Sequence, residues 1–468
     1  MTDFTKGENR YQSPLFTERL DDYIAADRHG CSDKSKTRPS TVVWRLEQMP
    51  DRTRSEFKKL LKERSSEATD ILLQLLAIPS ENPPADTGAI AQKISASLQS
   101  AGDVEIQLVT SKPPITNVVA IFRGHAPGRR LIFNGHLDTF AIGDESLWST
   151  RPSGELKNGR VYGRGAADMK GGVAAQVFAA RCLADFSEHW CGELVLTLTG
   201  DEQSGGDHGT AYLLENHPHA VGNAMMCADA GSPRVLRFGE KGTIWMTIEA
   251  EGVAGHGAHT HLTVNAIDRL VDAISAIRTL RETTVTLPSK IAKAISDAAP
   301  VSETLNGIGE AQVLKSITVN LGTINGGSRC NLAANHAQVT VDVRFPPGLL
   351  LIEMKEKIAT LLDVLPGITY RFDYGLDVNI TDPEDEIVQT VADVGEEIMG
   401  TRPVATMRVG SSDAALYRFK GVPSVICGLT PYNMGGVDEY VDVSELEMLG
   451  QIYALSAFDF LANSADRG

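Results

Sequence analysis

The sequence is short of positive charge, and its cysteines are too scattered to form a framework. It holds 44 Lys and Arg residues against 60 Asp and Glu residues, for a formal net charge of −16. Because nucleic acids and anionic membrane surfaces are bound mainly through clustered Lys and Arg, this balance argues against both as partners. The six cysteines lie far apart with no Cys-x-x-Cys pair, so neither a zinc ribbon nor a disulfide framework is indicated. We therefore expect a small molecule or a peptide as substrate.

Long apolar runs are also lacking. No stretch approaches the roughly 18 apolar residues of a membrane-spanning helix. The N-terminal sequence MTDFTKGENRYQ is polar and has no apolar signal-peptide core. These two absences predict a cytoplasmic protein. With 468 residues, 42% of them hydrophobic, the chain is long enough for two or three domains around a large core.

The pattern of apolar residues divides the chain into an extension, a large domain and an insert. Residues 1–61 are polar and charge-mixed without a sustained period, which indicates an N-terminal extension. Residues 62–238 and 376–468 alternate helices with near-continuous apolar strands, the pattern of an α/β domain with a mostly parallel sheet between helices. Residues 239–375 follow the order βαββαβ, which predicts an inserted two-layer α+β domain. A long polar connection is expected at residues 283–312 of this insert.

Three short motifs end or follow strands of the predicted sheet, where open α/β sheets place their sites. In NGHLDTF, His136 offers an imidazole at a strand end, and Asp138 can accept the other ring N–H. In GRGAADMKGG, an isolated Asp168 lies between glycines and a helix start, where an aspartate also serves as an N-cap. In LTLTGDEQSGG, Glu202 lies just beyond a strand and is either solvated or a general base.

Together, and in this order, these motifs resemble the metallopeptidase family of the aminoacylases, carboxypeptidase G and succinyl-diaminopimelate desuccinylase. The resemblance runs from about residue 62 to residue 465 and includes MMCADAG and GVAGHGAH. It implies a zinc-peptidase-like catalytic domain, a lid and dimerisation insert, and a homodimer through that insert or a larger assembly. It also implies that His136, Asp168 and Asp229 bind one metal ion. Asp168 would bridge to a second ion and precede a cis peptide bond to Met169.

The resemblance further implies roles outside the metal ligands. His256 matches a histidine that reaches into the partner subunit's active site and stabilises an oxyanion. Asn331 and Arg344 match residues that hold the substrate's carboxylate or carbonyl, and VGSSDAALY matches a loop along the substrate backbone. The implied substrate-binding residues are Asn331, Arg344, Gly410, Ser411 and Ser412.

The sequence departs from the family at the second metal ion. The family's Asp-Glu-Glu becomes DEQ, which puts Gln203 in place of a Glu ligand, and its C-terminal His-x-x-[Asp/Asn]-Glu becomes GGVDE, which puts Gly435 in place of a His ligand. No histidine follows His336, so no neighbour substitutes for the lost one. The two carboxylates of the retained ligands balance one divalent cation rather than two. We predict one ion per chain, Mn²⁺ or Zn²⁺, with Fe²⁺ and Co²⁺ as further candidates.

One metal ion still lowers the pKa of water, and Glu202 is then the expected general base. Loss of the second Lewis acid should hurt poorly activated amides most, so we expect a substrate that stabilises its own intermediate. An amino-substituted aromatic acid is such a substrate, and a single-metal family member such as 5-nitroanthranilate aminohydrolase fits this pattern. One alternative is a dinuclear amidohydrolase or peptidase with Gln203 and His208 as unusual ligands. Another is a retired enzyme that survives as a binding module, against which the retained Glu202 and His256 argue.

Two further histidines in HGAHTH extend the motif that contains His256. We interpret His259 and His261 as solvated loop residues, with the lining of a reshaped pocket as the alternative. His208, in GGDHG, is likewise expected at the surface.

Overall fold

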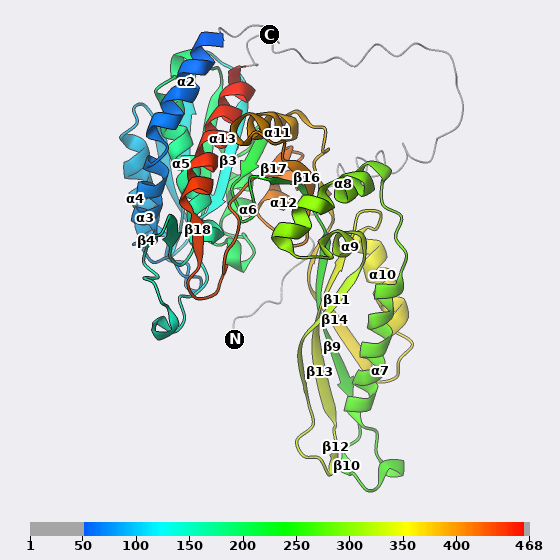
Figure 1. The fold of residues 1–468 in the computed structure, drawn as a ribbon. Coiled ribbons are helices and arrows are strands. Elements are labelled where there is room, and N and C mark those ends of the chain that lie inside the picture. The colour runs from blue at the N-terminus through cyan, green and yellow to red at the C-terminus, as the bar shows by residue number, and fades with distance from the viewer. Residues whose placement is uncertain (1–50, 463–468) are drawn as a thin grey trace, which may run out of the picture. The chain divides into compact units, whose positions relative to one another are not determined.

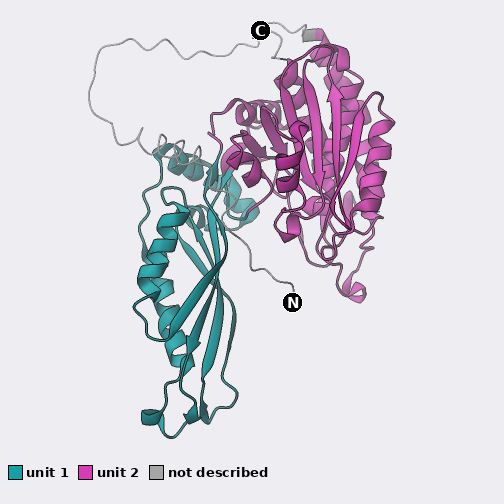
Figure 2. Cartoon of the chain, turned by 180° about the vertical axis from the view of Figure 1, so that it is seen from behind, with its two compact units in different colours: residues 1–30, 239–380, 407–410 teal, residues 31–238, 381–406, 411–468 magenta. Residues whose placement is uncertain are grey.

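The computed structural model describes residues 51–462 and divides them into two compact units (Figures 1 and 2). The inserted unit, teal in Figure 2, contains residues 239–380 and 407–410. The main unit, magenta in Figure 2, contains the other described residues. Each unit has its own sheet and its own buried apolar core.

The largest sheet has nine strands and is parallel at its centre. Its order is β1-β2-β6-β3-β7-β17-β8-β15, and β16 pairs with β8. The pairs β6–β3, β3–β7 and β7–β17 are parallel, whereas β1–β2, β2–β6, β17–β8 and β8–β15 are antiparallel. The predicted fold class is confirmed, with the parallel strands in the middle of the sheet. The strands are β1 (Glu105–Lys112), β2 (Ile115–Arg123), β3 (Arg130–His136), β6 (Glu193–Thr199), β7 (Ala224–Cys227), β8 (Val235–Glu240), β15 (Asn379–Ile380), β16 (Val404–Arg408) and β17 (Ser424–Ile426).

Helices bury the central strands of the main unit. All of β3 after its first residue is buried, which requires cover on both faces of the sheet. Helix α5 is buried along nearly its whole length and packs against α13. Gly450 permits this close approach, because a Cβ there would lie 2.6 Å from the Phe178 ring. Within residues 51–462, no helix is both long and apolar enough to cross a bilayer. The helices are α3 (Glu67–Leu76), α4 (Gly88–Gln99), α5 (Gly171–Ala184), α6 (Thr210–Asn216), α11 (Glu386–Met399), α12 (Ala414–Phe419) and α13 (Val443–Ala462).

The predicted extension contains a helix that its weak periodicity did not indicate. Helix α2 (Asp51–Arg64) buries Phe57 and Leu61 completely. The Phe57 ring centroid lies 5.1 Å from that of Phe458 in α13. Two apolar residues one turn apart are enough to dock a helix whose other positions are mostly charged, so the sequence pattern is faint. The rest of the predicted extension, residues 1–50, lies outside the described residues.

The inserted unit has a four-stranded antiparallel sheet of order β11-β13-β9-β14. Helices α7 and α10 pack against it, and burial alternates along β13, as expected for a sheet with one covered face. The predicted order βαββαβ is present as β9, α7, β11, β13, α10 and β14. The elements are β9 (Gly242–Glu251), β10 (Gly255–His256), β11 (Thr318–Gly326), β12 (Leu332–Ala333), β13 (His336–Phe345), β14 (Ile368–Leu376), α7 (Ala266–Arg278) and α10 (Leu351–Leu362).

The expected polar connection at residues 283–312 is mostly helical instead. It contains α8 (Ser289–Asn306) and the start of α9 (Glu310–Lys315). In α8 the buried side chains recur every three or four residues, which is a helical stripe on an otherwise polar segment. A three-stranded sheet in the main unit was also not predicted; it comprises β4 (Glu155–Lys157), β5 (Arg160–Tyr162) and β18 (Tyr440–Asp442).

Candidate metal centre

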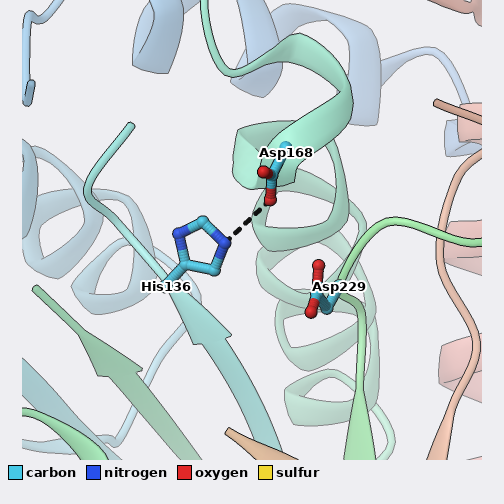
Figure 3. Close-up of side chains that lie close together, drawn as sticks. All are labelled: His136, Asp168 and Asp229. Atoms are coloured by element: carbon cyan, nitrogen blue, oxygen red, sulfur yellow. Dashed lines mark hydrogen bonds and ion pairs between the residues drawn. The ribbon is translucent and has the colours of Figure 1, made fainter. Parts of the chain in front are cut away.

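Three buried side chains meet beyond the carboxyl ends of the central strands (Figure 3). His136 ends β3, Asp229 follows the neighbouring parallel strand β7, and Asp168 precedes α5. Their candidate ligand atoms all lie within 4.8 Å of one another. Ligand atoms about 2.1 Å from one ion lie roughly 3 to 4 Å apart, so a slight contraction fits these residues to one divalent ion.

The tautomer of His136 leaves Nε2 free to bind a metal ion. Its Nδ1 lies 2.8 Å from the main-chain oxygen of Asp138, which can only accept, so Nδ1 carries the proton. Its Nε2 lies 2.9 Å from Oδ1 of Asp168 (Figure 3), a spacing that suits a hydrogen bond between them when the ring is protonated. Burial lowers the pKa of His136, but the surrounding carboxylates outweigh burial and raise it well above its ordinary value. A divalent ion would supply the same charge.

A buried ion pair holds the turn that carries Asp168. Glu439 accepts hydrogen bonds from the main-chain N–H groups of Ala167 at 2.9 Å and Asp168 at 3.3 Å. Its other oxygen accepts from Nη1 of Arg164 at 2.6 Å. The peptide bond between Asp168 and Met169 is cis, as the family resemblance implies. The sequence analysis assigned no role to Glu439 or Arg164. The available signal was their place in the quoted motifs: Arg164 lies in GRGAADMKGG, and Glu439 is the final Glu of the family pattern at GGVDE.

Asp138 has a different partner from the predicted one. Its carboxylate is 3.5 Å from Nδ1 of His136, so its main-chain oxygen is the closer partner of the ring. The carboxylate accepts from the main-chain N–H groups of Glu202 at 3.2 Å and Gln203 at 3.1 Å. It also accepts from the Asn82 side chain at 2.8 Å. Asp138 therefore holds the turn that carries Glu202, and Asn82 is a supporting residue that the sequence analysis missed.

Glu202 lies beside the three candidate ligands. It follows β6, its side chain is 17% exposed, and its Oε2 is 3.9 Å from Nε2 of His136. Burial raises the pKa of Glu202 well above its usual range, and the nearby Asp229 and Asp413 carboxylates raise it further, against the opposing effect of His136. A carboxylate with a raised pKa at this place is suited to accept a proton from water.

The two positions of the lost ligands offer no charge to a second ion. Nε2 of Gln203 donates to Oδ2 of Asp168 at 3.2 Å. Gly435 has φ of +72° and lies in an exposed loop. Over residues 51–462, the single cluster of three metal-binding side chains is His136, Asp168 and Asp229, so His208 belongs to no such group.

The predicted oxyanion residue lies in the inserted unit. His256, on β10, is exposed, and its Nδ1 accepts the N–H of Ala258 at 3.1 Å. The neutral ring therefore carries its proton on Nε2, as a hydrogen-bond donor to an oxyanion must. The His259 ring is 5.7 Å from that of His256, and the His261 ring is 6.0 Å from that of His259. Both are exposed, which agrees with the interpretation as loop residues.

The predicted substrate-binding residues are divided between the units. Asn331, Arg344 and Gly410 belong to the inserted unit, whereas Ser411 and Ser412 belong to the main unit. Asn331 is exposed. Arg344 is half-buried, and its Nη1 donates to the main-chain oxygen of Val409 at 3.1 Å. Their roles in binding stay predictions.

Comparison with known proteins finds a matching family and similar relatives. The sequence model of peptidase family M20/M25/M40 matches residues 132–458. A succinyl-diaminopimelate desuccinylase from Cereibacter sphaeroides is 30% identical over 365 residues, covering 74% of this chain and 88% of that protein. One from Ruegeria pomeroyi is 31% identical over 353 residues, covering 73% and 85%.

A solved structure with the same fold is the M20 family metallo-carboxypeptidase from Sulfolobus solfataricus. It has a TM-score of 0.69 and 18% identity, covering 84% of this chain and all (100%) of that one. A dinuclear metal-binding peptidase of the M20 family from Bacillus subtilis has a TM-score of 0.60 and 14% identity, covering 87% and 99%. The match over residues 132–458 and the identity to the desuccinylases place this chain in peptidase family M20/M25/M40, as a metal-dependent amidohydrolase that acts on C–N bonds.

Proposed function

We propose that this enzyme uses one divalent ion per chain to remove the amino group of an amino-substituted aromatic acid such as 5-nitroanthranilate. The observation that carries this proposal is the hydrogen bond from the Gln203 amide to Asp168. The amide supplies no negative charge where the family has a Glu ligand, and its N–H group occupies Oδ2 of Asp168, the carboxylate that would bridge to a second ion. Gly435 removes the other ligand of that ion.

The charges of the remaining ligands support the single ion. His136 is neutral when it binds a metal, and Asp168 and Asp229 supply two negative charges, which balance one divalent cation. An open position beside three ligands is the arrangement of catalytic rather than structural sites. Nitrogen and oxygen ligands suit Mn²⁺ and Zn²⁺, and also Fe²⁺ or Co²⁺. When bound, the ion supplies a Lewis acid and a lower pKa for water.

The residues of the chain then carry the protons. Glu202 takes a proton from water as the water oxygen forms a bond to the ring carbon that bears the amino group. The same carboxyl returns the proton to the nitrogen as the C–N bond breaks, so that ammonia and a hydroxylated ring are the products. The Asp138 carboxylate keeps Glu202 in place by accepting a hydrogen bond from the main-chain N–H of Glu202. As the family resemblance implies, His256 of the partner subunit donates its Nε2–H to the developing negative charge.

The substrate class follows from the loss of the second Lewis acid. A peptide carbonyl needs strong polarisation before water attacks it. A nitro group para to the amino group accepts the negative charge within the ring, so the substrate supplies part of the stabilisation itself. The resemblance of Asn331 and Arg344 to carboxylate-holding residues favours a substrate with a carboxylate.

A second candidate is the hydrolysis of an N-acyl amino acid. It is favoured by the desuccinylases, of which this chain covers most of the length. Manganese- or zinc-loaded protein should be incubated with 5-nitroanthranilate, N-succinyl-diaminopimelate, N-acyl amino acids and dipeptides. Release of ammonia from the aromatic acid is expected, whereas release of succinate, an acyl group or an amino acid with no ammonia would favour this second candidate.

Glu202→Gln is the control for catalysis by this site. It should lower kcat by about a thousandfold, the scale of general-base catalysis, and leave the metal content unchanged. Unchanged activity in this variant would instead favour a retired site that only binds.

A further inference from the structure

Phe140 is a large apolar side chain that is 42% exposed and lies close in sequence to the candidate metal ligand His136. It follows His136 by four residues, and the three residues between them are buried. The main chain at Thr139 is fixed on both sides, because its N–H donates to Ser80 and its oxygen accepts from Asn82. The Phe140 ring is therefore exposed on a well-held backbone.

Gly435 adjoins this ring and brings no side chain against it. A Cβ added at Gly435 would lie 3.3 Å from Cδ2 and 3.6 Å from Cε2 of Phe140. Any larger side chain there would cover the ring, and the φ of +72° disfavours one in any case. Met434 and Val437, in the loop that contains Gly435, are also exposed apolar side chains, at 46% and 40%. The position that matches a lost metal ligand thus adjoins an exposed aromatic ring.

Residues that neighbour Phe140 and Gly435 in the sequence form hydrogen bonds within the metal centre. From Gly435 the chain continues to Glu439, which binds the turn of Asp168. Asp138, two residues before Phe140, binds the turn of Gln203, whose amide binds Asp168. Phe140 and Gly435 therefore lie two and four residues along the chain from side chains that hydrogen-bond to the turns of the centre.

We propose that Phe140 determines specificity by stacking on the aromatic ring of the substrate, through the part of its ring that no side chain at Gly435 covers. This inference rests on the proposed function and adds a recognition residue to it. Exposed aromatic rings attract planar rings in offset stacked arrangements, a contact that is worth about twofold to tenfold in affinity. An aliphatic chain gains less from the same contact.

The test uses two unreactive probes and the metal-loaded full-length protein. 3-Nitrobenzoate is 5-nitroanthranilate without its amino group, and adipate is an aliphatic dicarboxylate. Phe140→Leu should weaken 3-nitrobenzoate binding by about fivefold to tenfold and change adipate binding less than about twofold. Gly435→Ala should act in the same direction, since its Cβ meets the ring, whereas Phe140→Tyr should retain binding.

Leu147→Ala is the matched control, because Leu147 is another apolar residue of the main unit and is 65% exposed. It should change neither probe, and metal content should be the same in every variant. Equal weakening of both probes by Phe140→Leu, or no preference of the unaltered protein for 3-nitrobenzoate, would overturn the inference. Failure of the proposed function is distinguishable, since it removes ammonia release while the aromatic preference and its dependence on Phe140 persist.

Discussion

The metal ligands that we propose to be retained and those that we propose to be lost lie in different kinds of structure. His136, Asp168 and Asp229 are buried and follow central strands or precede a central helix, where the packed core sets their positions. Gln203 lies in a short 3-10 helix (Glu202–Ser204) and Gly435 in a loop, and both are less buried. On the proposed function, this difference lets one half of the centre change its chemistry while the fold and the other half stay as they are.

Removal of a retained ligand should have the largest effect. Asp229→Ala takes away one of the two charges that balance the ion, so the variant is expected to lose both the metal and all measurable turnover. Metal analysis of the purified protein, together with the ammonia assay, checks this. Asp207→Ala, an exposed aspartate near the same site, should retain both. Full metal content in the Asp229 variant would remove this residue from the ligand set.

Removal of Glu439, the buried carboxylate that holds the main chain at Asp168, should have the second largest effect. Glu439→Ala leaves Arg164 unpaired at 5% exposure and should lower the free energy of unfolding by about 3 to 5 kcal/mol. It should also weaken metal binding, because Glu439 holds the main chain at Asp168. Chemical denaturation measures the first effect. Glu396→Ala breaks an exposed pair with Arg402 and should cost no more than about 1 kcal/mol. Equal losses in the two variants would contradict this account.

The smallest effect is expected for a change at Gln203, which stands in place of a ligand of the second ion. Gln203→Ala removes one hydrogen bond to Asp168 and should weaken metal binding by about tenfold while the number of bound ions stays the same. Isothermal titration with Mn²⁺ measures both quantities. Gln107→Ala, at an exposed glutamine on β1, is the control. A change as large as that of Asp229→Ala would show that Gln203 is itself a ligand.

The sequence predicted the fold class and the family because both depend on local patterns. Apolar periodicity identifies strands such as β3 and the alternating β13, and motifs at strand ends identify the side chains that the parallel strands bring to one edge. The partner of Asp168 was not predictable in this way. Glu439 meets Ala167 across 272 residues of sequence, and no periodicity connects them. Asp138 illustrates a second limit, because its side chain and its main-chain oxygen lie close enough together for either to accept from His136.

Helices α2 and α8 also could not be predicted from the sequence pattern alone. Both are mostly polar and bury few side chains, so their apolar stripes are narrow. A pattern of this kind resembles a solvated segment until the surface that covers it is known.

The number of metal ions held by each chain is the most direct test of the central claim. The unaltered protein should be loaded with excess Mn²⁺ or Zn²⁺, freed of unbound ions and analysed for metal per chain by mass spectrometry. We predict one tightly held ion per chain. Two tightly held ions per chain would contradict the interpretation that Gln203 and Gly435 have removed the second site.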